Sequence, residues 1–172
     1  MLMESIIKKT LGFKSHRVES VMLREEMLVA QIVPRKGSRP VCSRCGRKVS
    51  GYDSLMERTW RHIPCWGIPV CLVYRPRRGK CPTCGVKVEA MPWSRGKSFL
   101  SMPLIVVLAA FAKRLAWEDV ARLFGLHWNT VKAAVKHIVD YGYHEGSGLK
   151  YQVSSIGFNL RPDPILWEKQ NF

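Results

Sequence analysis

The sequence predicts an α+β protein, with a small metal-stapled β-rich region followed by a helical region. All six cysteines fall between residues 41 and 98, and four of them form two C-x-x-C-G motifs. The segments around them resemble short strands broken by Pro and Gly. From residue 101 the apolar residues recur at helical spacing instead. We therefore expect three parts, which span residues 1–98, 99–144 and 145–172.

The composition narrows the classes of partner. The chain has 172 residues, 28 Lys and Arg against 13 Asp and Glu, and a net charge of +15. Residues 41–98 alone carry 12 basic and 3 acidic side chains. Such a basic surface favours a polyanion, most commonly nucleic acid. The apolar run at 99–112 is too short for a bilayer, and no signal peptide is visible in residues 1–30. We expect a soluble, cytoplasmic, nucleoid-associated protein with no membrane partner and no small-molecule substrate.

Two hairpins are predicted in the first part. Residues 17–24 and 27–34 flank a polar Glu25-Glu26 turn. Residues 60–63 and 68–74 flank a turn that contains Gly. We expect the three tryptophans of this region to pack a small core rather than to stack on bases: Trp60, Trp66 and Trp93.

The two C-x-x-C-G motifs predict one zinc ion. Two residues between thiolates let a tight turn aim both sulfurs at one point, about 2.3 Å from the metal. The Gly after each pair permits a left-handed backbone. We expect a structural, four-thiolate Zn²⁺ site, because such a site has no open position for catalysis. Its ligands are Cys42, Cys45, Cys81 and Cys84.

Other interpretations of the cysteines are weaker. Disulfides need an oxidising compartment, which nothing in residues 1–30 indicates. A redox motif would not be expected twice with Gly behind each copy. Cys65 and Cys71, with His62, could form a second metal site, but we expect buried free thiols, since free Cys packs as a small hydrophobe.

A run of positive charge precedes the second cysteine pair. A charge run is usually a solvated face, but this one adjoins the predicted metal site in the most basic part of the chain. We therefore expect phosphate contacts from Arg75, Arg77, Arg78 and Lys80.

A helix-turn-helix is predicted in the second part. Pro103 suits the first turn of a helix that continues to Leu115. Beyond it, a small residue at Ala121 permits close helix crossing, and Gly125 permits the turn. Apolar residues are placed to fill the angle between the helices: Val120, Phe124, Leu126, Val131 and Ala134. An ordinary helical core without DNA is the competing interpretation.

The last helix has two faces. Val131, Ala134, Val135 and Ile138 recur at helical spacing and face the core. The opposite face is predicted to enter a major groove, where Asn129 could pair with adenine and Lys132 and Lys136 could touch guanine or phosphate. The predicted DNA-contacting residues of this region are His127, Trp128, Asn129, Thr130, Lys132, Ala133 and Lys136.

In this order, the motifs resemble the N-terminal half of transposases of the ISL-three insertion-sequence family. The resemblance covers about residues 10–144. It rests on the two cysteine motifs, on Arg58-Thr-Trp60-Arg61-His62-Ile63 between them, on Met91-Pro92-Trp93, and on the helix-turn-helix with Trp117-Glu-Asp-Val-Ala121. It implies binding to double-stranded DNA at the terminal inverted repeats of a transposon, with a possible homo-oligomer.

In that family an RNase-H-like catalytic domain follows, with three carboxylates that hold two divalent metals. Ile156-Gly157 resembles its first strand, but Phe158 and Asn159 stand where an acid is expected. Asp163 alone cannot form a two-metal site. We therefore expect no catalysis, with residues 145–172 as a truncated or frameshifted tail.

Two other functions compete with a transposase fragment. A free-standing, zinc-containing helix-turn-helix transcriptional regulator would carry the same motifs, although no dimerisation element is evident. An active nuclease would need clustered acidic groups, and Asp53, Asp119 and Asp140 are scattered along the sequence.

Overall fold

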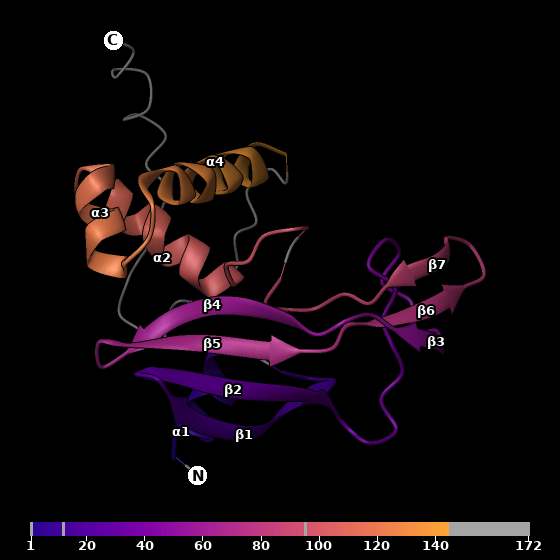
Figure 1. The fold of residues 1–172 in the computed structure, drawn as a ribbon. Coiled ribbons are helices and arrows are strands. Elements are labelled where there is room, and N and C mark those ends of the chain that lie inside the picture. Colours follow the sequence, from indigo (N-terminus) through magenta and orange to yellow (C-terminus); the bar gives the residue numbers. More distant parts are fainter. Residues whose placement is uncertain (1, 12, 95, 145–172) are drawn as a thin grey trace.

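The computed structural model describes residues 2–11, 13–94 and 96–144, and it confirms the α+β class. A β-rich N-terminal region is followed by helices (Figure 1). In chain order the elements are α1 (Leu2–Leu11), β1 (His16–Arg24), β2 (Met27–Pro34), β3 (Ser50–Ser54), β4 (Arg58–Cys65), β5 (Ile68–Tyr74), β6 (Arg77–Cys81), β7 (Gly85–Val88), α2 (Met102–Ala112), α3 (Trp117–Phe124) and α4 (Trp128–His144).

The two predicted hairpins form one four-stranded sheet with the order β1-β2-β5-β4. Each hairpin is antiparallel, and the two join through a parallel pairing of β2 with β5. Glu25 and Glu26 form the first turn with positive φ, and Trp66 and Gly67 form the second. Local turn chemistry predicted each hairpin, but the parallel join depends on packing between segments far apart in the sequence.

The N-terminal helix α1 was not predicted. Ile7 and Leu11 are four residues apart, so they lie on one face of the helix and are buried. They pack into the same core as Ala30 and Ile32 of β2. The lysines interrupt the apolar pattern in the sequence, so the helix was hard to predict. Lys8 and Lys9 lie in its last turn, where they complement the helix dipole.

The core of the large sheet is aromatic. Trp60 and Trp93 are completely buried and meet edge to face, with ring centroids 6.0 Å apart. Trp60 Nε1 also donates a hydrogen bond to Ser94 Oγ at 2.9 Å. The packing role predicted for these two residues is confirmed. For Trp66 it is wrong, because the side chain sits at a hairpin tip and is 76% exposed.

A second, three-stranded sheet has the order β3-β6-β7 and lies at one end of the structure (Figure 1). Strand β6 passes tightly beneath the segment that joins β2 to β3. A Cβ added at Gly79 would overlap the Val49 side chain, and it would come within 3.4 Å of Pro40 Cβ. Glycine at this position therefore lets β6 approach that segment closely.

The helices form a separate apolar cluster beside β4. Helix α2 begins after Ser101, whose hydroxyl accepts a hydrogen bond from the Leu104 N–H, and Pro103 lies in its first turn as predicted. The helix ends at Ala112 rather than at Leu115.

The boundary predicted at residue 98 falls just before a segment that runs along β4, where the Arg61 N–H donates to Phe99 O at 2.8 Å. The division into parts stays a prediction.

Candidate metal centre and nucleic-acid interface

The structure brings the four predicted ligand cysteines together. The sulfurs of Cys42, Cys45, Cys81 and Cys84 all lie within 4.8 Å of one another, and Cys45 Sγ is 3.6 Å from Cys81 Sγ. Four thiols at this separation can bind one metal ion, and their soft sulfur donors suit zinc-like metals. The cluster is half sheltered, since Cys42 and Cys81 are buried while Cys45 is exposed.

Each cysteine pair is held in a tight turn that ends in glycine. Gly46 and Gly85 have φ values of +72° and +73°, the left-handed region that side chains disfavour. The Gly46 N–H donates to Cys42 O at 2.9 Å, which closes the first turn. The backbone role predicted for the two glycines is therefore confirmed.

Local hydrogen bonds favour the thiolate form of two cysteines. The Thr83 hydroxyl lies 3.3 Å from Cys81 Sγ and lowers the pKa of that thiol to about 6. Backbone N–H groups of Cys45 and Arg44 lower the pKa of Cys42. Because the thiolate is the metal ligand, these contacts prepare the site for a cation.

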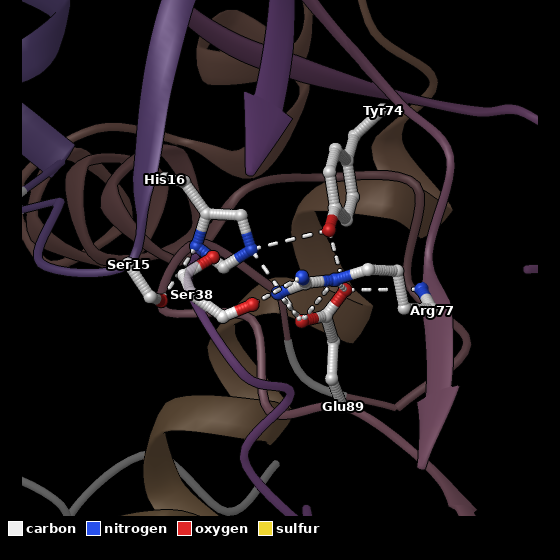
Figure 2. Close-up of polar contacts among 6 residues, drawn as sticks. All are labelled: Ser15, His16, Ser38, Tyr74, Arg77 and Glu89. Carbon is white, nitrogen blue, oxygen red and sulfur yellow. Dashed lines mark hydrogen bonds and ion pairs between the residues drawn. The ribbon is translucent and has the colours of Figure 1, made fainter. Parts of the chain in front are cut away.

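A buried ionic network lies close to the cysteine cluster and connects residues of the two sheets. Figure 2 shows its side chains. Its centre is Glu89, whose side chain is 1% exposed and whose backbone bridges to Cys42. Arg77 donates to its carboxylate from Nη2 at 2.7 Å and from Nε at 3.1 Å. Tyr74 also donates to Glu89, and His16 Nε2 lies 3.7 Å from it.

The network keeps Glu89 ionised inside the protein. Burial raises the pKa of a carboxyl group, but the polar contacts with His16, Arg77 and Tyr74 outweigh it and lower the pKa of Glu89 to about 2. The Tyr74 phenol has a raised pKa, because it is buried and donates to that carboxylate. Sequence reasoning missed Glu89. Its one visible signal was an acidic residue in the most basic stretch of the chain.

The predicted basic run divides into inward and outward residues. The guanidinium of Arg77 faces Glu89, and its Nη1 donates to Ser38 O at 2.9 Å, so it serves the fold. Arg78 pairs with Asp53 through Nε at 2.6 Å and lies over the exposed Tyr52 ring. Arg75 and Lys80 are exposed. Outward positive charge in this run therefore comes mainly from Arg75 and Lys80.

Helices α3 and α4 meet at a turn of the predicted kind. Gly125 ends α3 in the left-handed conformation, with φ +57° and ψ +46°. The Leu126 N–H then donates to Ala121 O at 2.8 Å. Val120 and Val131 are fully buried between the helices, while Phe124 and Leu126 pack on the same cluster from its edge.

Helix α4 has the two predicted faces. Val131, Ala134 and Val135 are buried. The opposite stripe is exposed at His127, Trp128, Asn129, Lys132, Ala133 and Lys136, while Thr130 is half-buried. His127 Nδ1 accepts a hydrogen bond from the Asn129 N–H at 3.2 Å, and so caps the helix start. Lys132 Nζ lies 5.7 Å from the Trp128 ring centroid.

The remaining candidates do not gather into a site. His62 is buried and hydrogen-bonded to Ser101 at 2.8 Å, and burial lowers its pKa to about 4. Cys65 and Cys71 are half-buried rather than fully buried thiols. Among the described residues, the group of three or more Cys, His, Asp or Glu side chains that lie close enough to share a metal ion is the four-cysteine cluster. Asp163 and the segment 145–172 lie outside the described residues.

In the part of the chain that the structure covers, no helix has both the length and the apolar character needed to cross a bilayer.

The chain is similar to known transposases. It is 34% identical over 116 residues to the transposase for insertion sequence element IS1557 of Mycobacterium tuberculosis strain CDC 1551 / Oshkosh. The corresponding protein of strain ATCC 25618 / H37Rv aligns with the same identity. The alignment covers 64% of this chain and 25% of either relative, so the chain spans about a quarter of the length of these proteins. No family model matches the chain, and no solved structure matches it.

Proposed function

We propose that this chain is a DNA-binding portion of a transposase of the ISL-three type, and that it recognises the ends of a transposon. The observation that carries the proposal is the exposed stripe of α4, placed behind a glycine turn in a chain that is similar to transposases. In a helix-turn-helix, a stripe of this kind lies in the major groove of duplex DNA.

The stripe supplies groups that can read bases. Asn129 has the donor and acceptor needed for an adenine edge, and Lys132 and Lys136 can reach guanine or phosphate oxygens. Trp128 lies against Lys132, which limits the directions in which that amine can point. The terminal inverted repeats are the sequence that this helix would read.

The zinc-bearing sheet supplies contacts that do not depend on sequence. Arg75 and Lys80 are exposed, and Arg78 is half-exposed and paired with Asp53. The cysteine cluster would hold a structural Zn²⁺, which fixes these side chains on one small sheet. Such contacts give affinity and salt dependence rather than choice of sequence.

Strand cleavage is not part of the function proposed for the described residues. Asp53 pairs with Arg78, and Asp119 pairs with Arg122 one helical turn away. A two-metal centre needs several carboxylates at one point. The proposal therefore assigns this portion to binding, and any transposition would depend on residues beyond it.

Selection of duplexes from a random pool, with the full chain and bound zinc, tests the proposal. We expect one sequence to be enriched, which should match an inverted repeat flanking the gene. The double variant Lys132→Ala/Lys136→Ala should lose about tenfold or more in affinity for that sequence, and less for random DNA.

Lys8→Ala/Lys9→Ala is the matched control. It removes the same charge from the exposed surface of α1, so binding should change little. Enrichment of no sequence would contradict the proposal. Enrichment of a site in a promoter, without inverted repeats, would instead support a transcriptional regulator.

A further inference from the structure

The triplet Trp60-Arg61-His62 of β4 connects the sheet to the helices. Trp60 Nε1 donates a hydrogen bond to Ser94 Oγ at 2.9 Å, and His62 Nδ1 is hydrogen-bonded to Ser101 Oγ at 2.8 Å. Ser101 is the residue that caps α2, so His62 is fixed to the start of that helix. The proposed function gives this triplet no role.

Arg61 reaches furthest into the helical region. Its side chain crosses to the turn between α3 and α4, where Nη2 donates to Phe124 O at 3.1 Å and Nη1 donates to Gly125 O at 3.0 Å. Carbonyls at a helix C-terminus lack partners within the helix and carry partial negative charge. A guanidinium offers two parallel donors, so it fixes direction as well as distance.

The backbone of Arg61 holds the same region a second time. Its N–H donates to Phe99 O at 2.8 Å, and its carbonyl accepts from the Ser101 N–H at 2.9 Å. A Cβ at Gly125 would lie 3.4 Å from Arg61 Nη2, an ordinary contact distance, so the positive φ of this turn rather than the guanidinium favours glycine. One residue of the sheet is therefore bonded to the segments that precede both α2 and α4.

We propose that Arg61 is a positioning residue that sets the place of α4 relative to the zinc-bearing sheet, so that the two contact DNA at one fixed separation. The inference rests on the proposed function. The sheet β3-β6-β7 and helix α4 lie apart in the fold (Figure 1). Helix α4 packs on α2 and α3, and α2 in turn packs on β4 of the large sheet. When α4 is bound, a rigid linkage raises the effective concentration of the sheet at the DNA only if the distance between sheet and helix matches the distance between their binding positions.

The experiment measures binding to the duplex that the wild-type full chain selects, and to versions with uncharged methylphosphonate linkages in the protected segment outside the selected sequence. Wild type should lose about tenfold or more on this neutralisation, because a rigidly held sheet meets only those phosphates. Arg61→Ala should bind the intact duplex about tenfold more weakly, but should lose less than about threefold on neutralisation, because a loosely held sheet can use neighbouring phosphates. Arg122→Ala is the matched control: it removes one positive charge, as Arg61→Ala does, from a side chain of α3 that is 80% exposed. It should behave as wild type.

Arg61→Lys provides a second variant in case the alanine chain does not fold. It keeps the charge and the aliphatic stem but cannot bond both carbonyls in one plane. Its loss of affinity on phosphate neutralisation should also fall, and hydrogen exchange in the first turn of α4 should accelerate without DNA. A loss on neutralisation equal to that of wild type would overturn the inference while leaving the proposed function intact. A wild-type chain that selects no duplex would overturn both.

Discussion

Glu89 and Arg77 form an ion pair at the edge of the small sheet, with Arg77 Nη2 2.7 Å from Glu89 Oε2, and Tyr74 of the large sheet donates to the same carboxylate. The Arg77 side chain is 17% exposed and that of Glu89 is 1% exposed. Removal of one partner would leave the other buried and uncompensated.

Replacement of this carboxylate should destabilise the fold strongly. We expect Glu89→Gln to lower the free energy of unfolding by about 3 kcal/mol, because Arg77 loses its buried counter-charge and the amide offers one acceptor oxygen instead of two. Urea unfolding with saturating zinc measures the difference. Asp53→Asn is the control, since it breaks the exposed pair with Arg78 and should have little effect. Equal losses in both variants would contradict a special role for the buried pair.

Acid should destabilise the protein through His62. Burial lowers the pKa of His62 to about 4, below its ordinary value of 6.5. The unfolded chain therefore takes up the proton first, and stability is lost as pH falls from 6.5 towards 4. A shift of this size corresponds to about 3 kcal/mol in total.

The variant His62→Gln separates this effect from protonation of the metal-binding thiols, which is common to both proteins. The stability difference between wild type and variant should shrink between pH 7 and pH 4.5. Stability curves that stay parallel over that range would show that His62 does not titrate as proposed.

Metal removal should unfold the small sheet. A strong chelator should lower the melting temperature and release about one zinc ion per chain, because four thiolates hold the two cysteine turns together. Cys42→Ser/Cys84→Ser should purify without metal, whereas Cys71→Ser should keep it. Elemental analysis and thermal melts give the measurements. If the double variant still binds DNA, the metal centre is not needed to support the DNA-binding site.

Gly79 should tolerate no side chain. In Gly79→Ala the new Cβ would overlap the Val49 side chain and press on the Ser50 carbonyl. We expect a loss of about 1–3 kcal/mol in the free energy of unfolding. Gly51→Ala is a matched control on the neighbouring strand, because open space surrounds that position. Similar stabilities of the two variants would exclude the proposed close approach.

Local patterns predicted much of this structure. Cysteine spacing brought four sulfurs together correctly, and the spacing of Val131 and Ala134 identified the buried face of α4. Partners distant in sequence could not be predicted in this way. Glu89 is 12 residues from Arg77, and Arg61 is 63 residues from Phe124. Nothing local to either residue indicates which group it will meet. The orientation of Arg77 differs from that of Arg75 for the same reason.

The parallel join of β2 and β5 also bears on how the chain folds. Leu28 pairs with Val70, and Gln31 pairs with Val73. The pairing encloses the first cysteine motif and two strands within a closed loop of chain. Loop closure is opposed by chain entropy, and non-local strand pairing slows folding. We expect the two hairpins to form early and their docking to limit the rate, so that a nascent chain exposes the unpaired edge of β2 until residue 73 has emerged.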